Sequence, residues 1–260
     1  MIADSSLGGT PLLQVTDLRR SFGGVHAVDG ASFVVRQGTI TGLIGPNGAG
    51  KSTAIGMIAG AIVPTGGSIE FAGRVVTREP AYKMARRGLT RTFQLSSEFA
   101  RLTVLENLLV AAPGQRGESL WGAFLGKPYW RRQERALVEQ ARDLMSRFAM
   151  TEKEDEYAGN LSGGQKRLVE IMRALMARPK LLLLDEPMAG VNPTLAGRIA
   201  AYLEELRDGG LTMLLVEHEL AHVDRLCNPV VVMAQGKVLA EGTMAELRTQ
   251  REVVDAYLVG

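Results

Sequence analysis

A chain of 260 residues, 46% of them hydrophobic, can bury one large core or two smaller ones, which bounds it to one or two domains. Its 30 lysines and arginines nearly balance its 28 aspartates and glutamates, and the net charge of +2 excludes a basic face built for nucleic acid. The single cysteine, Cys227, excludes an internal disulfide, fits a reducing compartment and is expected to be a small buried hydrophobe.

The N-terminal stretch and the most apolar stretch both argue against membrane insertion by this chain. Residues 1–10 have neither the cationic start nor the apolar run of a signal peptide. The longest nearly apolar stretch, residues 54–63, is about half of the roughly 20 residues that a helix needs to cross a bilayer. We therefore expect a soluble chain, so that any membrane crossing belongs to another polypeptide.

The first third of the chain predicts mainly strands. Residues 12–22 and 27–38 alternate in character, as strands of a half-exposed antiparallel sheet do. Residues 39–45, TITGLIG, predict a buried strand, and residues 51–62 predict the helix that follows it. Residues 66–76 predict a further hairpin.

The middle of the chain, from about Lys83 to Leu175, predicts helices instead. Residues 131–149 and 165–177 carry apolar residues at three- and four-residue spacing among charged ones. Strand signals return at residues 180–185, 211–217 and 229–242, the last of these a hairpin. This order predicts an α/β core that is interrupted by a helical insertion.

The strongest chemical signal is GPNGAGKST, which lies between the predicted buried strand and its helix. It matches Gly-x4-Gly-Lys-Ser/Thr, in which glycines let backbone N–H groups turn toward phosphate oxygens and the helix N-terminus adds partial positive charge. Lys51 can reach the β- and γ-phosphates, and the Ser52 hydroxyl can ligate Mg²⁺. A plain glycine-rich turn is the alternative, but the strand and helix on either side favour nucleotide binding. The residues expected to bind it are Gly45, Pro46, Asn47, Gly48, Ala49, Gly50, Lys51, Ser52 and Thr53.

The sequence LLLLDEP, residues 181–187, supplies two carboxylates to the same site. A run of leucines is typical of a central parallel strand that is buried on both faces, and such strands present ligand-binding residues at their carboxyl ends. Asp185 can hold Mg²⁺, while Glu186 can orient and deprotonate the attacking water. The alternative is that the two carboxylates only keep the end of the strand solvated and have no chemical role. A neighbouring phosphate loop disfavours this alternative.

A third motif, LSGGQ at residues 161–165, stands before the helical pattern 165–177. Physically it is a second anion site, with Ser162, Gly163, Gly164 and Gln165 at a helix N-terminus. A plain helix cap by Ser162 is the alternative, which the order of the motifs disfavours. LSGGQ followed by the LLLLDEP strand resembles the nucleotide-binding domain of ATP-binding cassette (ABC) proteins. The resemblance covers residues 12–247 and implies ATP and Mg²⁺ as cofactors.

The resemblance also implies a fold and a division of the chain. The fold is an α/β P-loop NTPase of the ABC type, with an N-terminal antiparallel β-subdomain and an inserted helical subdomain. We expect a single ABC ATPase domain over residues 12–250. Within it, residues 12–90 and 176–250 would form a RecA-like core with the β-subdomain, and residues from about 91 to 175 the helical subdomain. Residues 251–260 would be a C-terminal tail.

Further residue roles follow from the same resemblance. Phe22 resembles the aromatic residue that stacks on adenine, although an isolated phenylalanine is often a core residue. Gln94, in RTFQ, resembles the glutamine of the loop between the core and the helical subdomain, which senses Mg²⁺ and lies near the membrane partner. Residues 189–193, AGVNP, occupy the position of the D-loop at the dimer interface. The resemblance implies catalysis by Lys51, Gln94, Glu186 and His218, and Mg²⁺ binding by Ser52, Gln94 and Asp185.

His218 raises a competing interpretation, because VEHELAH contains His-Glu-x-x-His, the spacing by which zinc proteases hold their metal on a helix. That interpretation needs His218 and His222 within one helix and a third ligand downstream. His218 instead follows the predicted strand 211–217 and so resembles the switch histidine of ABC proteins, near the γ-phosphate. The nucleotide motifs around it favour this second role and leave His222 as a surface helix residue.

The partners and the class of function also come from the resemblance. It implies transmembrane permease subunits, a second nucleotide-binding subunit, identical or homologous, and, indirectly, a periplasmic or lipoprotein substrate-binding protein. It implies that the chain is a peripheral subunit at the cytoplasmic face of the inner membrane. It implies no nucleic acid partner. A soluble ABC ATPase of DNA repair or translation is the alternative, and the single motif set and lack of extended heptads argue against it. A catalytically dead cassette is opposed by the intact Lys51, Asp185, Glu186 and His218.

Several stretches resemble the ATP-binding subunit of branched-chain amino acid importers. They are residues 85–94, 102–112, the insertion 120–137, AGVNP, VEHEL and the tail 253–260, while residues 95–101 depart from that pattern. The departure leaves a related cargo open, such as urea, short amides or another amino acid. Lipopolysaccharide export is a further alternative, against which the insertion argues.

Overall fold

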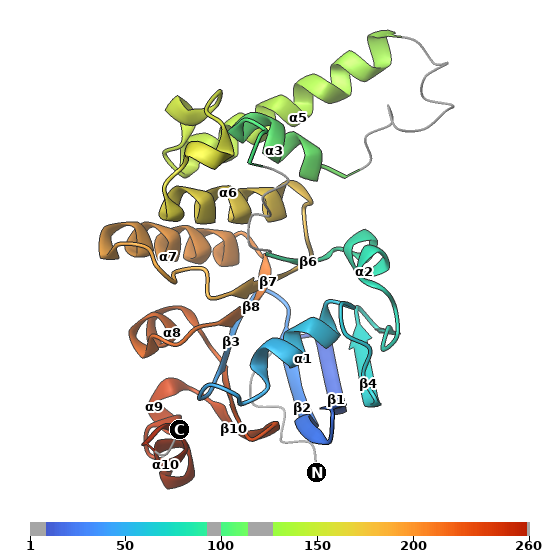
Figure 1. Cartoon of the computed structure of the whole chain (residues 1–260), viewed down its shortest axis with the longest axis vertical. Coiled ribbons are helices and arrows are strands. Elements are labelled where there is room, and N and C mark those ends of the chain that lie inside the picture. Colours follow the sequence, from blue (N-terminus) through green and yellow to red (C-terminus); the bar gives the residue numbers. More distant parts are fainter. Residues whose placement is uncertain (1–8, 93–99, 114–126, 259–260) are drawn as a thin grey trace. The chain divides into compact units, whose positions relative to one another are not determined.

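The computed structural model describes residues 9–92, 100–113 and 127–258, and these form two compact units. The first, here called the core unit, comprises Met1–Arg91, Lys180–Glu186 and Leu203–Gly260. The second, the helical unit, comprises Thr92–Pro179 and Pro187–Tyr202. Figure 1 shows the strands in the core unit and helices in the other.

A six-stranded sheet forms the centre of the core unit, in the order β10-β9-β3-β8-β7-β6. Its strands are β3 (Ile40–Ile44), β6 (Leu89–Arg91), β7 (Leu181–Asp185), β8 (Thr212–Val216), β9 (Val230–Ala234) and β10 (Lys237–Gly242). The strands from β9 to β6 pair in parallel, and β10 pairs antiparallel with β9. Every residue of β3 and β8 is buried, as is expected of apolar runs covered on both faces.

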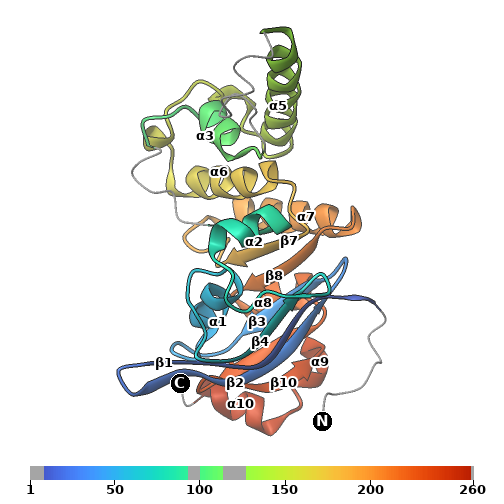
Figure 2. The same cartoon turned by 90° about the vertical axis from the view of Figure 1, so that its right-hand side faces the viewer.

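A four-stranded antiparallel sheet, in the order β2-β1-β4-β5, completes the strands of the core unit. It consists of β1 (Pro11–Phe22), β2 (Val25–Arg36), β4 (Gly66–Phe71) and β5 (Arg74–Val75), and Figure 2 shows β1, β2 and β4 side by side. Leu13 pairs with Val35 on one side and with Phe71 on the other, and all three side chains are buried. The alternation in the sequence thus gives the sheet one apolar face. The predicted N-terminal antiparallel sheet is present.

The core unit also contains short helices. They are α1 (Lys51–Ile58), α2 (Ala81–Arg87), α8 (Leu220–Leu226), α9 (Met244–Leu247) and α10 (Arg251–Leu258). Cys227, directly after α8, is buried, and burial raises the pKa of its thiol to about 12, so it is the inert hydrophobe that the sequence predicts.

The helical unit contains α3 (Val104–Ala111), α5 (Lys127–Arg147), α6 (Gly163–Met176) and the first part of α7 (Pro193–Asp208). Two short 3₁₀ turns, Thr151–Lys153 and Ala158–Asn160, lie between α5 and α6. The rings of Phe148 and Tyr202 meet with centroids 4.1 Å apart. Within residues 9–92, 100–113 and 127–258, every helix is too short or too polar to span a bilayer.

Candidate functional site

The loop between β3 and α1 has a backbone that only glycine can supply at two places. Gly45 has φ 149° and Gly50 φ 96°. A Cβ on Gly45 would lie 2.0 Å from the Met233 carbonyl oxygen, and one on Gly50 would lie 2.2 Å from that of Ala27. The chain can therefore turn tightly here and leave the backbone amides of the loop close to any ligand.

The N-terminus of α1 is open to such a ligand. Gly50 is its N-cap residue and has no side chain with which to cap the first turn. The first N–H groups of a helix have no partner within it, and the helix dipole makes this end favourable for anions. Ser52, in the first turn, is exposed, so its hydroxyl is accessible at the same end.

Lys51 is held inside the loop. Its side chain is only 6% exposed, and its Nζ donates hydrogen bonds to the carbonyl oxygens of Gly45 at 2.7 Å and Pro46 at 2.9 Å. Burial lowers the pKa of Lys51, while the charges of Glu186 and Asp185 oppose that shift. The ammonium is thus a partly desolvated cation near two carboxylates, and a bound phosphate would stabilise it further.

The two carboxylates stand where the central strand ends. Asp185 is the last residue of β7, and its Oδ2 accepts a hydrogen bond of 2.7 Å from Nη2 of Arg91 on β6. Glu186 follows with φ 49°, and its backbone N–H donates to the Val216 carbonyl oxygen at the end of β8.

His218 lies beside Glu186. Its Nε2 is 2.6 Å from Oε1 of Glu186, and the two side chains are 43% and 39% exposed. Because β7 and β8 are parallel neighbours, the segments that follow them emerge at the same edge of the sheet. The structure therefore brings Lys51, Asp185, Glu186 and His218 into one part of the core unit.

The geometry is unfavourable to the zinc interpretation. His218 lies in a bend before α8, whereas His222 lies within that helix. The described residues contain no group of three or more histidine, cysteine, aspartate or glutamate side chains that could hold a metal ion together. His222 is not the surface residue that was predicted: its side chain is only 19% exposed, and its Nδ1 lies 3.5 Å from Oε2 of Glu219.

The LSGGQ motif caps a helix in the helical unit. The Ser162 hydroxyl accepts a hydrogen bond from the Gln165 backbone N–H, and the Gln165 side chain accepts one from the Ser162 backbone N–H. The two glycines between them differ. A Cβ on Gly164 would lie 2.6 Å from Cδ2 of Leu195, whereas one on Gly163 would meet no atom within 4 Å. A side chain at Gly164 would force Leu195 to shift, whereas Gly163 leaves an open surface at the N-terminus of α6, an end that the helix dipole makes favourable for anions.

Of the remaining predicted residues, some are described and some are not. Phe22 ends β1, is 45% exposed and lies under the Arg20 guanidinium, which is 4.6 Å from the ring centroid. Arg20 covers one face of the ring, and the exposure of Phe22 leaves the rest accessible for stacking. Asn192 accepts a hydrogen bond from the Leu195 N–H in the first turn of α7. Gln94 lies outside the described residues.

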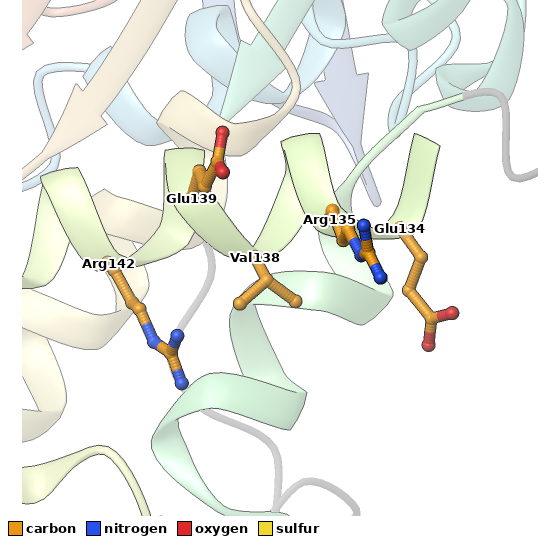
Figure 3. Close-up of a pocket in the computed structure, with 5 residues that line it drawn as sticks. All are labelled: Glu134, Arg135, Val138, Glu139 and Arg142. Atoms are coloured by element: carbon orange, nitrogen blue, oxygen red, sulfur yellow. The ribbon is translucent and has the colours of Figure 1, made fainter. Parts of the chain in front are cut away.

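Two features have no counterpart among the predicted residues. Arg91 contacts Asp185, and although Arg91 is the first residue of RTFQ, nothing in that sequence marks it as a partner of Asp185. A hollow of about 370 Å³ lies along α5, and Figure 3 shows that its lining side chains all project from that one helix. They are Glu134, Arg135, Val138, Glu139 and Arg142.

Comparison with known proteins places this geometry in a family. The family model of the ABC transporter matches residues 28–189. The high-affinity branched-chain amino acid transport ATP-binding protein BraF of Pseudomonas aeruginosa is 39% identical, covering 95% of this chain and 98% of that protein. The probable branched-chain amino acid transport ATP-binding protein LivG of Archaeoglobus fulgidus is 38% identical, covering 95% of each.

Solved structures agree with these relatives. A nucleotide-free ATP-binding cassette from an ABC transporter has a TM-score of 0.83 at 36% identity, covering 95% of this chain and 99% of that one. The ADP conformation of such a cassette has the same TM-score and identity, covering 96% and 100%. The predicted α/β P-loop fold is therefore confirmed, and the chain belongs to the ABC transporter family as one of its ATP-binding proteins.

Proposed function

We propose that this chain hydrolyses ATP to power an importer of branched-chain amino acids, as a peripheral subunit at the cytoplasmic face of the inner membrane. The contact between Glu186 and His218, beside Lys51 and Asp185, carries the proposal of hydrolysis. The names of the relatives, which match this chain over nearly its whole length, support the cargo.

The loop and α1 would bind the phosphates. The loop N–H groups and the open N-terminus of α1 offer donors, and Lys51 would exchange its hydrogen bonds with Gly45 and Pro46 for bonds to the β- and γ-phosphates. Phe22, exposed at the end of β1, would stack on the adenine.

The donor set fits Mg²⁺, which prefers oxygen ligands from carboxylates and phosphates. Ser52 offers an exposed hydroxyl and Asp185 a carboxylate at a strand end, and Gln94 would complete the set. When bound, Mg²⁺ would neutralise charge on the phosphates.

Glu186 and His218 would act on the attacking water. Glu186 would accept the proton of that water, and His218 would hold the carboxylate and approach the γ-phosphate. The 2.6 Å contact of the two side chains supports a shared role, because each orients the other.

Ser162, Gly163, Gly164 and Gln165 would serve a second nucleotide-binding subunit, identical or homologous. In this proposal two subunits meet head to tail, and the LSGGQ end of one contacts the nucleotide of the other. The open surface at Gly163 supports it. Two permease chains and a substrate-binding protein would complete the transporter, and selectivity would reside in them.

The cargo is tested in the reconstituted transporter. Leucine-loaded binding protein is expected to raise the ATPase rate above that with unloaded protein, and isoleucine and valine should act alike. Stimulation by urea, short amides or another amino acid, without stimulation by these three, would contradict the cargo and leave the motor function intact. A complex that is indifferent to every binding protein would favour lipopolysaccharide export or a cassette ATPase outside transport.

A further inference from the structure

Arg91 contacts the carboxylate that the proposed function assigns to Mg²⁺. In the parallel pair of β6 and β7, Arg91 stands opposite Leu183, and Asp185 follows two residues later on the same face of β7. Nη2 of Arg91 reaches Oδ2 of Asp185 at 2.7 Å. Both side chains are mostly withdrawn from water, at 20% and 22% exposure, so their attraction is screened less than that of a surface pair.

The geometry of this pair differs from that of a neighbouring ion pair. Arg87, at the end of α2, binds Glu79 through two hydrogen bonds of 2.6 Å, one from Nε and one from Nη2. Arg91 makes one hydrogen bond to Asp185, and its buried Nε has no hydrogen-bond partner among the described residues. Since bidentate pairs are the stronger ones, Arg87 binds Glu79 more strongly than Arg91 binds Asp185.

We propose that Arg91 is a positioning residue that holds Asp185 and competes with Mg²⁺ for that carboxylate. Arg91 would thereby set the Mg²⁺ concentration at which the site fills. The inference rests on the proposed ATP and Mg²⁺ site and is independent of the cargo.

The physical basis is a competition between cations. The Asp185 carboxylate contacts a guanidinium and, in the proposed function, also binds a divalent ion, and both cations gain from the same negative charge. When Mg²⁺ binds Asp185, it must displace Arg91 from that carboxylate or share the carboxylate with it. The positive charge of the Arg91 guanidinium also repels the ion. Removing the charge should tighten Mg²⁺ binding by about tenfold or more, because a guanidinium and a divalent ion a few ångströms apart repel each other even when water screens them strongly.

The test measures binding and not turnover. The parent chain, Arg91→Gln and Arg91→Lys would each be titrated with Mg²⁺ in the presence of a fluorescent, non-hydrolysable ATP analogue. The half-saturating Mg²⁺ concentration should fall about tenfold in Arg91→Gln. It should fall about threefold in Arg91→Lys, whose shorter chain withdraws the charge from Asp185. Arg87→Gln, which breaks the structural pair instead, is the matched control and should leave the concentration unchanged.

The outcomes separate this inference from the function on which it rests. An unchanged half-saturating concentration in the Arg91 variants overturns it, and a raised one does so too, because Arg91 would then assist Mg²⁺. Thermal unfolding checks that each variant is folded. If Arg91→Gln does not fold, the comparison is made with Arg91→Lys. If the parent chain itself shows no Mg²⁺-dependent nucleotide binding, the proposed ATP site is wrong. This result is obtained before any variant is compared, so the two failures are distinguishable.

Discussion

At the scale of single residues, Glu186 combines an unusual backbone with a close side-chain contact. Its φ of 49° lies in the left-handed region, which costs an L-residue about 1–2 kcal/mol. The hydrogen bond from its N–H to Val216 and the 2.6 Å contact with His218 hold it there. Strain of this kind persists only where the surroundings impose it, and here β8 and the segment after it do so.

Replacing Glu186 by glutamine tests its proposed role as the base. The amide is nearly isosteric with the carboxylate but cannot accept the proton of the water, so ATP hydrolysis should fall on the order of 100-fold or more. ATP affinity should stay within about threefold, because the phosphate loop is unchanged. Phosphate release and nucleotide titration measure the two quantities. Hydrolysis at the parental rate would show that another group is the base.

The site residues that could be predicted are those that lie in a recognisable sequence motif or directly after a predicted strand. Lys51, Asp185 and His218 could be picked out because each lies in a motif or directly after a predicted strand. Arg91 could not, since its contact with Asp185 depends on the register of β6 against β7, which no local pattern encodes.

At the scale of elements, the junction of the phosphate loop with α1 depends on Gly50. In Gly50→Ala, the new Cβ would lie 2.2 Å from the Ala27 carbonyl oxygen, at a residue whose φ is 96°. The free energy of unfolding should therefore fall by about 1–3 kcal/mol. Gly48→Ala is the matched control, since Gly48 has φ 78° but open space around its Cβ. Thermal unfolding of both variants measures the difference. Equal losses would show that the clash is relieved by movement of the loop.

The elements that the sequence mislocated are short or end at a glycine. Residues 51–62 predicted one helix, but α1 ends at Ile58, because Gly60 takes φ 73° just after the C-cap residue Ala59. β6 was not predicted, since the strand is three residues long and shows too little alternation to stand out from the helical stretch around it. Longer runs such as β7 were predicted, because burial on both faces demands a continuous apolar sequence.

At the scale of the whole molecule, the parts of the proposed ATP site belong to different compact units. Lys51, Asp185, Glu186 and His218 lie in the core unit, whereas Ser162 and Gly163 lie in the helical unit. The first-turn N–H groups of α6 at Gly163 and Gly164 have no partner within a helix, which suits an anion that comes from outside the chain. A second copy or a homologous subunit, with its nucleotide bound, could supply that anion.

Nucleotide should therefore control assembly. Glu186→Gln, which retains ATP, is expected to sediment as a dimer with saturating MgATP and as a monomer with ADP, because the γ-phosphate gives the α6 N-terminus of the partner an additional negative group to bind. Gly163→Gln tests the contact surface in the same background. Its side chain points into open space, so the unfolding temperature should stay the same while the dimer is lost. Sedimentation velocity and thermal unfolding measure the two effects. If Glu186→Gln remains a monomer with saturating MgATP, both alone and beside its cognate partner subunit, the head-to-tail arrangement is wrong.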